Sequence, residues 1–253
     1  MAKLTLLEMV QDILSDIDSD EVNSINDTPD ALQIAGVVKS SYFAILDSKD
    51  SWPHLRTLMA LDASGDTAKP THMKLPDNVK ALETVKYNKV KTGETQTKFR
   101  DITYLEPEEF LDKVNVYNTD ATNITLVTDF SGVSVPVKTD QGPEYWTSFD
   151  DEWLVFNSYD SAVDSTLQSS KTQCMAYRQP AWTVDDSFTP DLPDEAFSYL
   201  LAESKKIAFS RYKQVAEGTS VEQATRGRRA MSRKSWRAAG GFSQPNYGRQ
   251  SRK

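Results

Sequence analysis

The chain has 253 residues and a formal net charge of −8, with a single cysteine. This length allows one large domain, or a domain with a sizeable insertion. One cysteine excludes an internal disulfide framework and any cysteine-based metal cluster. No apolar run approaches the roughly 18 residues that span a bilayer, so the sequence predicts neither a transmembrane helix nor a signal peptide.

Charge is distributed unevenly along the chain. From Leu201 onward, 13 Lys and Arg residues accompany three acids, whereas the first 200 residues carry 16 basic and 34 acidic residues. An acidic body with a basic end indicates either that nucleic acid binds at this end or that the end docks on an acidic protein surface.

Two helices are predicted near the start of the chain. Thr5 and Glu8 have the spacing of a capping box, so a helix is expected to begin there and to end near Ile17. Thr28, followed by Pro29, begins a second helix that is expected to reach Leu46. The wide apolar face of this second helix predicts that it packs between two other helices.

The sequence pattern changes after position 50, where prolines, turn signals and β-branched residues replace the helical periodicity. This pattern predicts an inserted β-rich domain with a short helix at 106–110 and a hairpin turn at 131–132. The predicted strands cover residues 55–61, 79–90, 99–104, 124–130, 132–138, 144–149, 152–156 and 168–182.

Helical periodicity resumes at Pro193, and a further helix is predicted near Ser220. The expected fold class is therefore α+β, with a helical bundle base that takes helices from both ends of the chain, an inserted antiparallel β domain and an extended C-terminal tail. The predicted parts are N-terminal helices at 1–50, the β-rich domain at 51–187, C-terminal helices at 188–225 and a basic extended tail at 226–253.

Neither metal binding nor cofactor binding is predicted. Asp16, Asp18 and Asp20 alternate as in the start of a calcium loop. However, Glu21 occupies the position that needs glycine, and Asp27 the position that needs a bidentate glutamate. The two histidines, His54 and His72, lack the spacing of a metal site or a catalytic triad, so a structural role is expected for both.

One cluster of acids could carry out chemistry. Asp150, Asp151 and Glu152 lie beside Trp153, and glycoside hydrolysis requires two carboxylates flanking a bond. The favoured interpretation is a hairpin turn of acids between two strands, because nothing in the sequence fixes the separation of the carboxylates. Motifs for nucleotide binding or for an activated serine are absent from the sequence, so a non-enzymatic protein is predicted.

The C-terminal 28 residues form the candidate binding segment, because they contain nine basic residues and no acid. Such a segment cannot bury enough apolar surface to order itself alone. It could bind phosphates without reading sequence, or dock on a protein through arginines and aromatic anchors. The candidate docking residues are Arg226, Arg228, Arg229, Trp236, Arg237, Phe242, Tyr247 and Arg249.

Several stretches carry a resemblance to known proteins when they are taken together: LTLLEMVQDILSDIDSDEVNSINDT at 4–28, WPHL at 52–55, KPTHMKLP at 69–76, LPDEAF at 192–197, and the WR and NYGR of the tail. Together they resemble the head-to-tail adaptor (connector, tail tubular type) proteins of short-tailed bacteriophages, across most of the chain. The resemblance implies a homo-oligomeric ring, typically of twelve subunits, seated under the portal protein, with a lumen through which genomic DNA passes.

The resemblance also implies a C-terminal segment that extends onto the portal and a β domain that faces the tail nozzle or tail fibres. The expected location is the neck and tail region of the virion, and the host cytoplasm during assembly. An acidic lumen would let DNA slide without sticking, because it offers phosphates no cations. Two alternatives stay open at this point: a DNA-binding accessory protein that uses the basic tail, and a peptidoglycan hydrolase that acts through the acids at 150–152.

Overall fold

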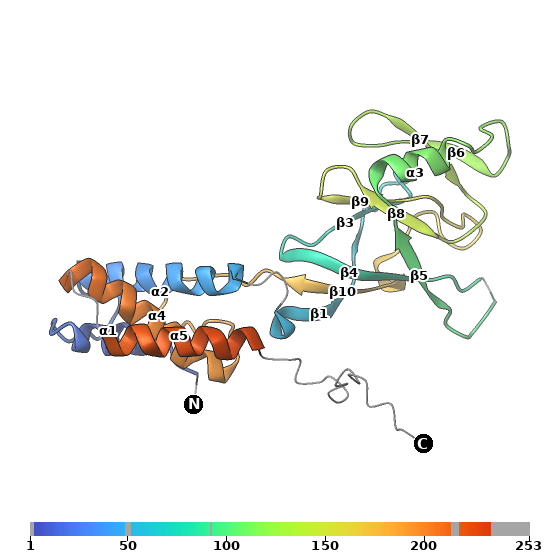
Figure 1. The fold of residues 1–253 in the computed structure, drawn as a ribbon. Helices are drawn as coiled ribbons and strands as arrows, with labels where there is room; N and C mark the ends of the chain where they lie inside the picture. Colours follow the sequence, from blue (N-terminus) through green and yellow to red (C-terminus); the bar gives the residue numbers. More distant parts are fainter. Residues whose placement is uncertain (1–2, 49–51, 92, 214–217, 234–253) are drawn as a thin grey trace, which may run out of the picture. The chain divides into compact units, whose positions relative to one another are not determined.

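A computed structural model describes residues 3–48, 52–91, 93–213 and 218–233 (Figure 1). The chain is a mixed α+β protein, which confirms the predicted class at this level. It divides into two compact units. A helical unit combines residues 1–54 with residues 181–253, and a β unit consists of Leu55–Pro180. The β unit is thus inserted between the two halves of the helical unit.

The first two helices begin where the sequence predicts. Helix α1, Leu6–Asp16, has a complete capping box, in which the Thr5 hydroxyl accepts from the Glu8 backbone N–H at 3.2 Å and the Glu8 carboxylate accepts from the Thr5 N–H at 2.7 Å. Helix α2, Pro29–Asp47, is capped by the Thr28 hydroxyl. Both sets of interactions satisfy backbone N–H groups that a first helical turn leaves unpaired.

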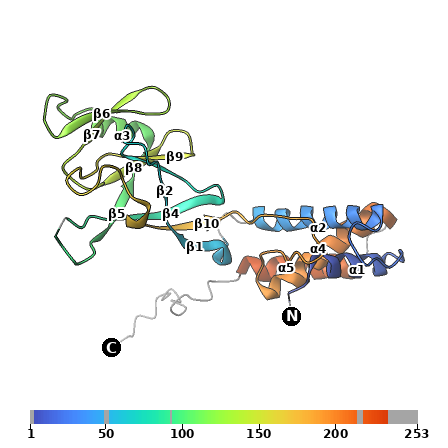
Figure 2. The ribbon, with the colours of Figure 1, turned by 180° about the vertical axis from the view of Figure 1, so that it is seen from behind.

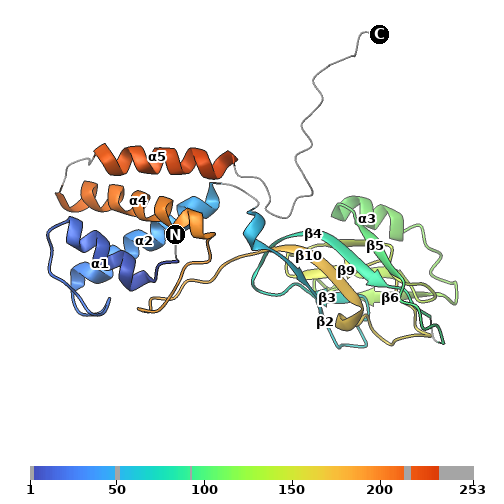
Figure 3. The ribbon, with the colours of Figure 1, turned by 90° about the horizontal axis from the view of Figure 1, so that it is seen from below.

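Two helices from the C-terminal part complete the helical unit. A 3₁₀ turn at Asp194–Ala196 leads into α4, Phe197–Ala208, which continues as a π-helical turn at Phe209–Lys213. Helix α5 is Gly218–Arg233. Helix α4 lies between α5 on one side and the α1 and α2 pair on the other (Figure 3). Helix α2 packs against both α1 and α4, which confirms that its wide apolar face contacts two helices.

Helix α5 corrects the prediction of an extended tail from residue 226. Residues 226–233 are helical, and they form the C-terminal half of α5. The stripe of α5 that faces α4 consists mainly of small residues, which are buried Ser220, buried Ala224 and half-buried Gly227, followed by buried Met231. A stripe this poor in large apolar side chains gives little hydrophobic periodicity, so the sequence pattern did not reveal it. The rest of the predicted tail, 234–253, lies outside the described residues.

The β unit contains an eight-stranded sheet and a separate two-stranded hairpin (Figures 1 and 2). In spatial order, the strands of the large sheet are β1 Arg56–Met59, β10 Thr172–Arg178, β4 Val79–Asn88, β5 Phe99–Tyr104, β8 Tyr145–Ser148, β9 Trp153–Phe156, β3 His72–Lys74 and β2 Asp62–Ala63. The hairpin pairs β6, Ile124–Thr128, with β7, Ser134–Lys138. Gly132, with φ of +85°, lies in the hairpin turn, as predicted.

The large sheet is not wholly antiparallel, which corrects the prediction. Strands β5 and β8 are parallel, with Thr103 opposite Tyr145 and Tyr104 opposite Trp146. Between these strands the chain forms α3, Pro107–Val114, and the β6–β7 hairpin. A parallel pair requires such a long crossover connection, whereas an antiparallel pair can be joined by a tight turn. Strands β2 and β3 were not predicted, because two or three residues are too few to show a period.

Candidate functional site

Helix α5 carries the three candidate residues that the structure describes. Arg226, Arg228 and Arg229 are all exposed, and the buried stripe of α5 faces α4. With 3.6 residues per turn, Arg226 and Arg229 fall on the face opposite that stripe, and Arg228 lies at its flank. The Arg226 guanidinium pairs with Glu222 at 3.1 Å, and both side chains are more than two-thirds exposed, at 79% and 71%.

Arg228, at the flank of the stripe, influences the pKa of Tyr199 on α4. Burial of Tyr199 and the nearby Glu203 carboxylate raise the pKa of this tyrosine, and the positive charge of Arg228 opposes them. Arg228 is therefore close to α4. The structure places Arg226 and Arg229 together on one outer face and separates Arg228 from them.

Five of the candidate docking residues have no described position: Trp236, Arg237, Phe242, Tyr247 and Arg249 lie outside the described residues. What the structure establishes is where their segment begins. It follows Arg233 directly, at the end of a helix that is held against α4. The candidate site therefore starts from a fixed helix.

The acids at 12–18 hold α1 against the C-terminal half of the helical unit. The Lys205 ammonium lies 2.8 Å from Asp12 and 2.6 Å from Asp16, and Lys213 lies 2.8 Å from Asp18. Burial disfavours the charged form of Lys205, but the two carboxylates outweigh it and raise its pKa. Within the described ranges, no group of three His, Cys, Asp or Glu residues could hold a metal ion.

The acids at 150–152 form the turn between β8 and β9. The Asp150 carboxylate accepts from the backbone N–H groups of Glu152 at 3.0 Å and Trp153 at 2.8 Å. Glu152 pairs with Lys74 at 3.3 Å, and Asp151 has a positive φ of 60°. These contacts give Asp150 and Glu152 structural partners, and the arrangement matches the hairpin-turn interpretation.

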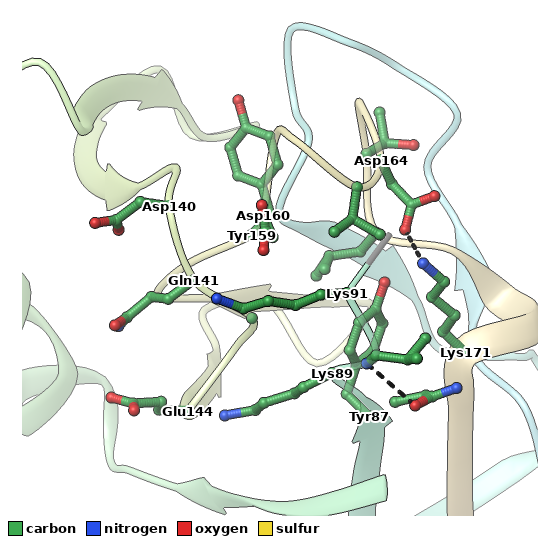
Figure 4. Close-up of a pocket in the computed structure, with 16 residues that line it drawn as sticks. Tyr87, Lys89, Lys91, Asp140, Gln141, Glu144, Tyr159, Asp160, Asp164 and Lys171 are labelled. Atoms are coloured by element: carbon green, nitrogen blue, oxygen red, sulfur yellow. Dashed lines mark hydrogen bonds and ion pairs between the residues drawn. The ribbon is translucent and has the colours of Figure 1, made fainter. Parts of the chain in front are cut away.

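A pocket of about 220 Å³ lies in the β unit, between the end of β4, the loop at 140–144 and the segment at 159–171 (Figure 4). Its lining includes three lysines and four acids, which are Lys89, Lys91, Lys171, Asp140, Glu144, Asp160 and Asp164. Lys171 pairs with Asp164, and burial lowers the pKa of Lys89 although Glu144 opposes it. The sequence did not predict this pocket, because three separated segments contribute to it.

A buried histidine joins the β6–β7 hairpin to the large sheet. His72 on β3 is 1% exposed, and its Nε2 lies 3.0 Å from Asp129, which follows β6. Burial favours the neutral acid, but N–H groups of Ser131, His72 and Phe130 outweigh it and hold the pKa of Asp129 below its usual value. The ionised carboxylate can only accept, so His72 donates from Nε2. This position agrees with the structural role expected for His72.

Acidification is expected to destabilise the β unit through His72. Burial lowers the pKa of His72, and the Asp129 carboxylate opposes this without cancelling it. The unfolded chain therefore binds the proton more readily, so stability is lost as the pH falls below about 6.5 towards the folded-state pKa. Urea unfolding between pH 5 and 7.5 measures this loss. The His72→Gln variant keeps an N–H for Asp129 but has no imidazole to titrate, so its free energy of unfolding should depend less on pH. A pH dependence as steep as that of the wild type would contradict this role of His72.

No protein-family model matches the chain, and neither does any curated protein sequence. In the parts of the chain that the structure describes, no helix has both the length and the apolar character needed to cross a membrane. The function of the chain is therefore inferred from its residues and geometry and from the resemblance that its sequence carries.

Proposed function

We propose that the protein is a head-to-tail adaptor of a short-tailed bacteriophage, a non-enzymatic virion protein that forms a ring under the portal. The observation that carries this proposal is the arrangement of the helical unit. Both halves of the chain build it, the β unit is inserted between them, and α5 leads from it directly into the basic C-terminal segment. The resemblance to adaptors implies the same division into a helical base, a β insertion and a portal-binding end.

The portal contact is assigned to the C-terminal segment that starts in α5. Beyond α5 this segment holds five basic residues, no acid and three aromatic residues: Lys234, Arg237, Arg249, Arg252, Lys253, Trp236, Phe242 and Tyr247. Aromatic residues and arginines are the side chains that most often dominate the binding energy of protein interfaces. A peptide of this composition suits a portal surface that offers acids around apolar pockets.

The β unit would face the tail nozzle or the tail fibres. Its β6–β7 hairpin exposes three apolar side chains, since Leu126, Phe130 and Val133 are 56%, 49% and 59% exposed. Three exposed apolar side chains on one hairpin support a protein-binding role. Genomic DNA would pass through the lumen of the ring, of twelve subunits by the resemblance, without sequence-specific contacts.

Deletion of residues 234–253 should abolish portal binding and leave both units folded. The deletion begins after α5, so Met231 and the rest of the stripe that faces α4 are retained. Deletion from 226 would instead remove half of α5. Co-sedimentation of the protein with portal-bearing particles measures binding, and circular dichroism checks the fold. Normal incorporation of the truncated protein would overturn the portal assignment.

A DNA-binding accessory protein is the rival function, because the same segment is basic enough to bind phosphates. A peptide of residues 226–253 would be titrated against duplex DNA and against portal protein over a salt series. Binding to phosphates alone weakens steeply as salt rises, because binding releases counterions from the DNA and added salt opposes that release. Portal binding anchored by aromatic residues should persist at salt concentrations that remove DNA. The reverse order would favour the accessory protein.

A further inference from the structure

The outer face of α5 displays arginines from a fixed position. Arg226 and Arg229 lie opposite the stripe that α5 buries on α4, and the Arg226 side chain is 79% exposed. Gly227 lies so close to Tyr199 that an added Cβ would be 2.8 Å from that side chain. The close packing leaves α5 little room to rotate, so the face that carries these arginines keeps one direction.

A second charged surface is the acidic loop, defined as residues 17–28 between α1 and α2. Buried Val22 and Ile25 anchor it, and the Ile25 N–H donates to the Asp186 carboxylate at 2.8 Å. Asp20 and Glu21 are exposed, and neither has a basic partner among the residues that the structure describes. Together with α1, this loop borders a groove of about 530 Å³.

These two charged surfaces lie on opposite sides of the same unit. Helix α4 separates α5 from α1 and α2, between which the acidic loop runs (Figure 3). The arginine face and the acidic loop therefore cannot meet within one copy. They can meet between two copies that have the same orientation, and a contact between two different surfaces repeats from copy to copy until it closes a ring or extends a filament.

We infer that the arginine face of α5 binds the acidic loop and its groove on the next copy of the chain. This inference rests on the proposed function, because the adaptor ring is what makes the repeated contact close. It divides the candidate site between two partners. Arg226 and Arg229 contact the neighbouring subunit, and residues 234–253 are left for the portal.

Charge complementarity selects a second copy as the occupant. The same acidic stretch already binds cations of this chain, since Lys205 pairs with Asp12 and Asp16, and Lys213 pairs with Asp18. Asp20 and Glu21 continue that stretch. The planar guanidinium offers paired N–H donors that match a carboxylate, so arginines suit these acids better than lysines would.

The test is a charge exchange in the full-length protein, followed by sedimentation velocity over a range of concentrations. The wild type should self-associate at low salt, and more weakly as salt rises, because exposed charges are screened. Arg226→Glu/Arg229→Glu and Asp20→Lys/Glu21→Lys should each weaken association by about tenfold or more, since they place like charges together. The protein with all four changes should regain association.

The matched control is Lys39→Glu/Lys80→Glu, which changes the net charge as much as the arginine variant does at two exposed positions outside both surfaces. This control should associate like the wild type. A wild type that stays monomeric at every concentration, or a fourfold variant that stays dissociated, would overturn the inference.

Portal binding is measured separately, with the 234–253 deletion. That protein should still self-associate while it fails to bind the portal. If the wild type binds the portal but the fourfold variant does not regain self-association, the subunit contact alone is rejected. A wild type that self-associates but never binds portal would reject the adaptor function.

Discussion

Replacing Phe156 with alanine should destabilise the β unit by about 3–5 kcal/mol, the usual cost of removing a fully buried phenylalanine. Phe156 is 0% exposed and lies at the end of β9. It belongs to the main apolar cluster of the sheet, with Leu61, Met73, Val85, Tyr87, Ile102, Leu154, Leu167 and Cys174. Because most of these side chains come from strands across the sheet, the cavity cannot collapse by moving one loop.

Urea unfolding followed by tryptophan fluorescence measures this effect, since Trp146 and Trp153 lie on strands beside the cluster. The control is Val116→Ala, at a side chain that is 82% exposed, and it should change the free energy of unfolding by less than about 0.5 kcal/mol. A loss below about 1 kcal/mol for Phe156→Ala would mean that the cluster is not the core of this unit.

Replacing Gly227 with alanine should loosen α5 from α4 by about 1–3 kcal/mol. The new Cβ would lie 2.8 Å from Cβ and Cδ2 of Tyr199 and 2.9 Å from Cγ. These atoms are at the base of a side chain that is 7% exposed, so relief requires the helix to shift. Alanine favours helix over glycine by up to about 1 kcal/mol, which reduces the loss but does not remove the steric overlap.

Hydrogen exchange of α5 amides measures this effect, because local opening of α5 will be more frequent in the variant. Tyr199→Ala in the same chain removes the obstructing side chain, so the double variant should lose less stability than the two single changes predict together. Additive losses would show that Tyr199 does not limit the approach of α5. Unchanged protection of α5 would show that the two helices are not closely packed.

Much of the helical unit could be predicted from its sequence because its signals are local. The capping box at Thr5 and the proline after Thr28 act within one helical turn, and both helices begin where these residues indicate.

Some strands of the β unit could also be predicted. The predicted strand at 99–104 coincides with β5, since a run rich in β-branched and aromatic residues is typical of a strand. The strand predicted at 168–182 is shorter, and forms Thr172–Arg178.

Features that depend on long-range contacts could not be predicted. The packing of α5 depends on Gly227 meeting Tyr199, 28 positions earlier, and a glycine gives no hydrophobic signal of its own. The parallel pairing of β5 with β8 depends on the path of the chain between them. Asp129 and His72 become partners only when the hairpin folds against β3.

The division of the chain into units also sets the order in which it can fold during synthesis. The β unit is continuous in sequence, so it can fold as soon as Pro180 has left the ribosome. Helices α1 and α2 must wait for α4, which is about 150 residues further on, or roughly 8–30 s at typical rates of translation. The apolar side chains that α1 and α2 pack on α4 are exposed during this delay. The arginine face of α5 and the segment proposed for portal contact are therefore made last, so a nascent chain cannot offer them to an assembling particle before its β unit has been synthesised.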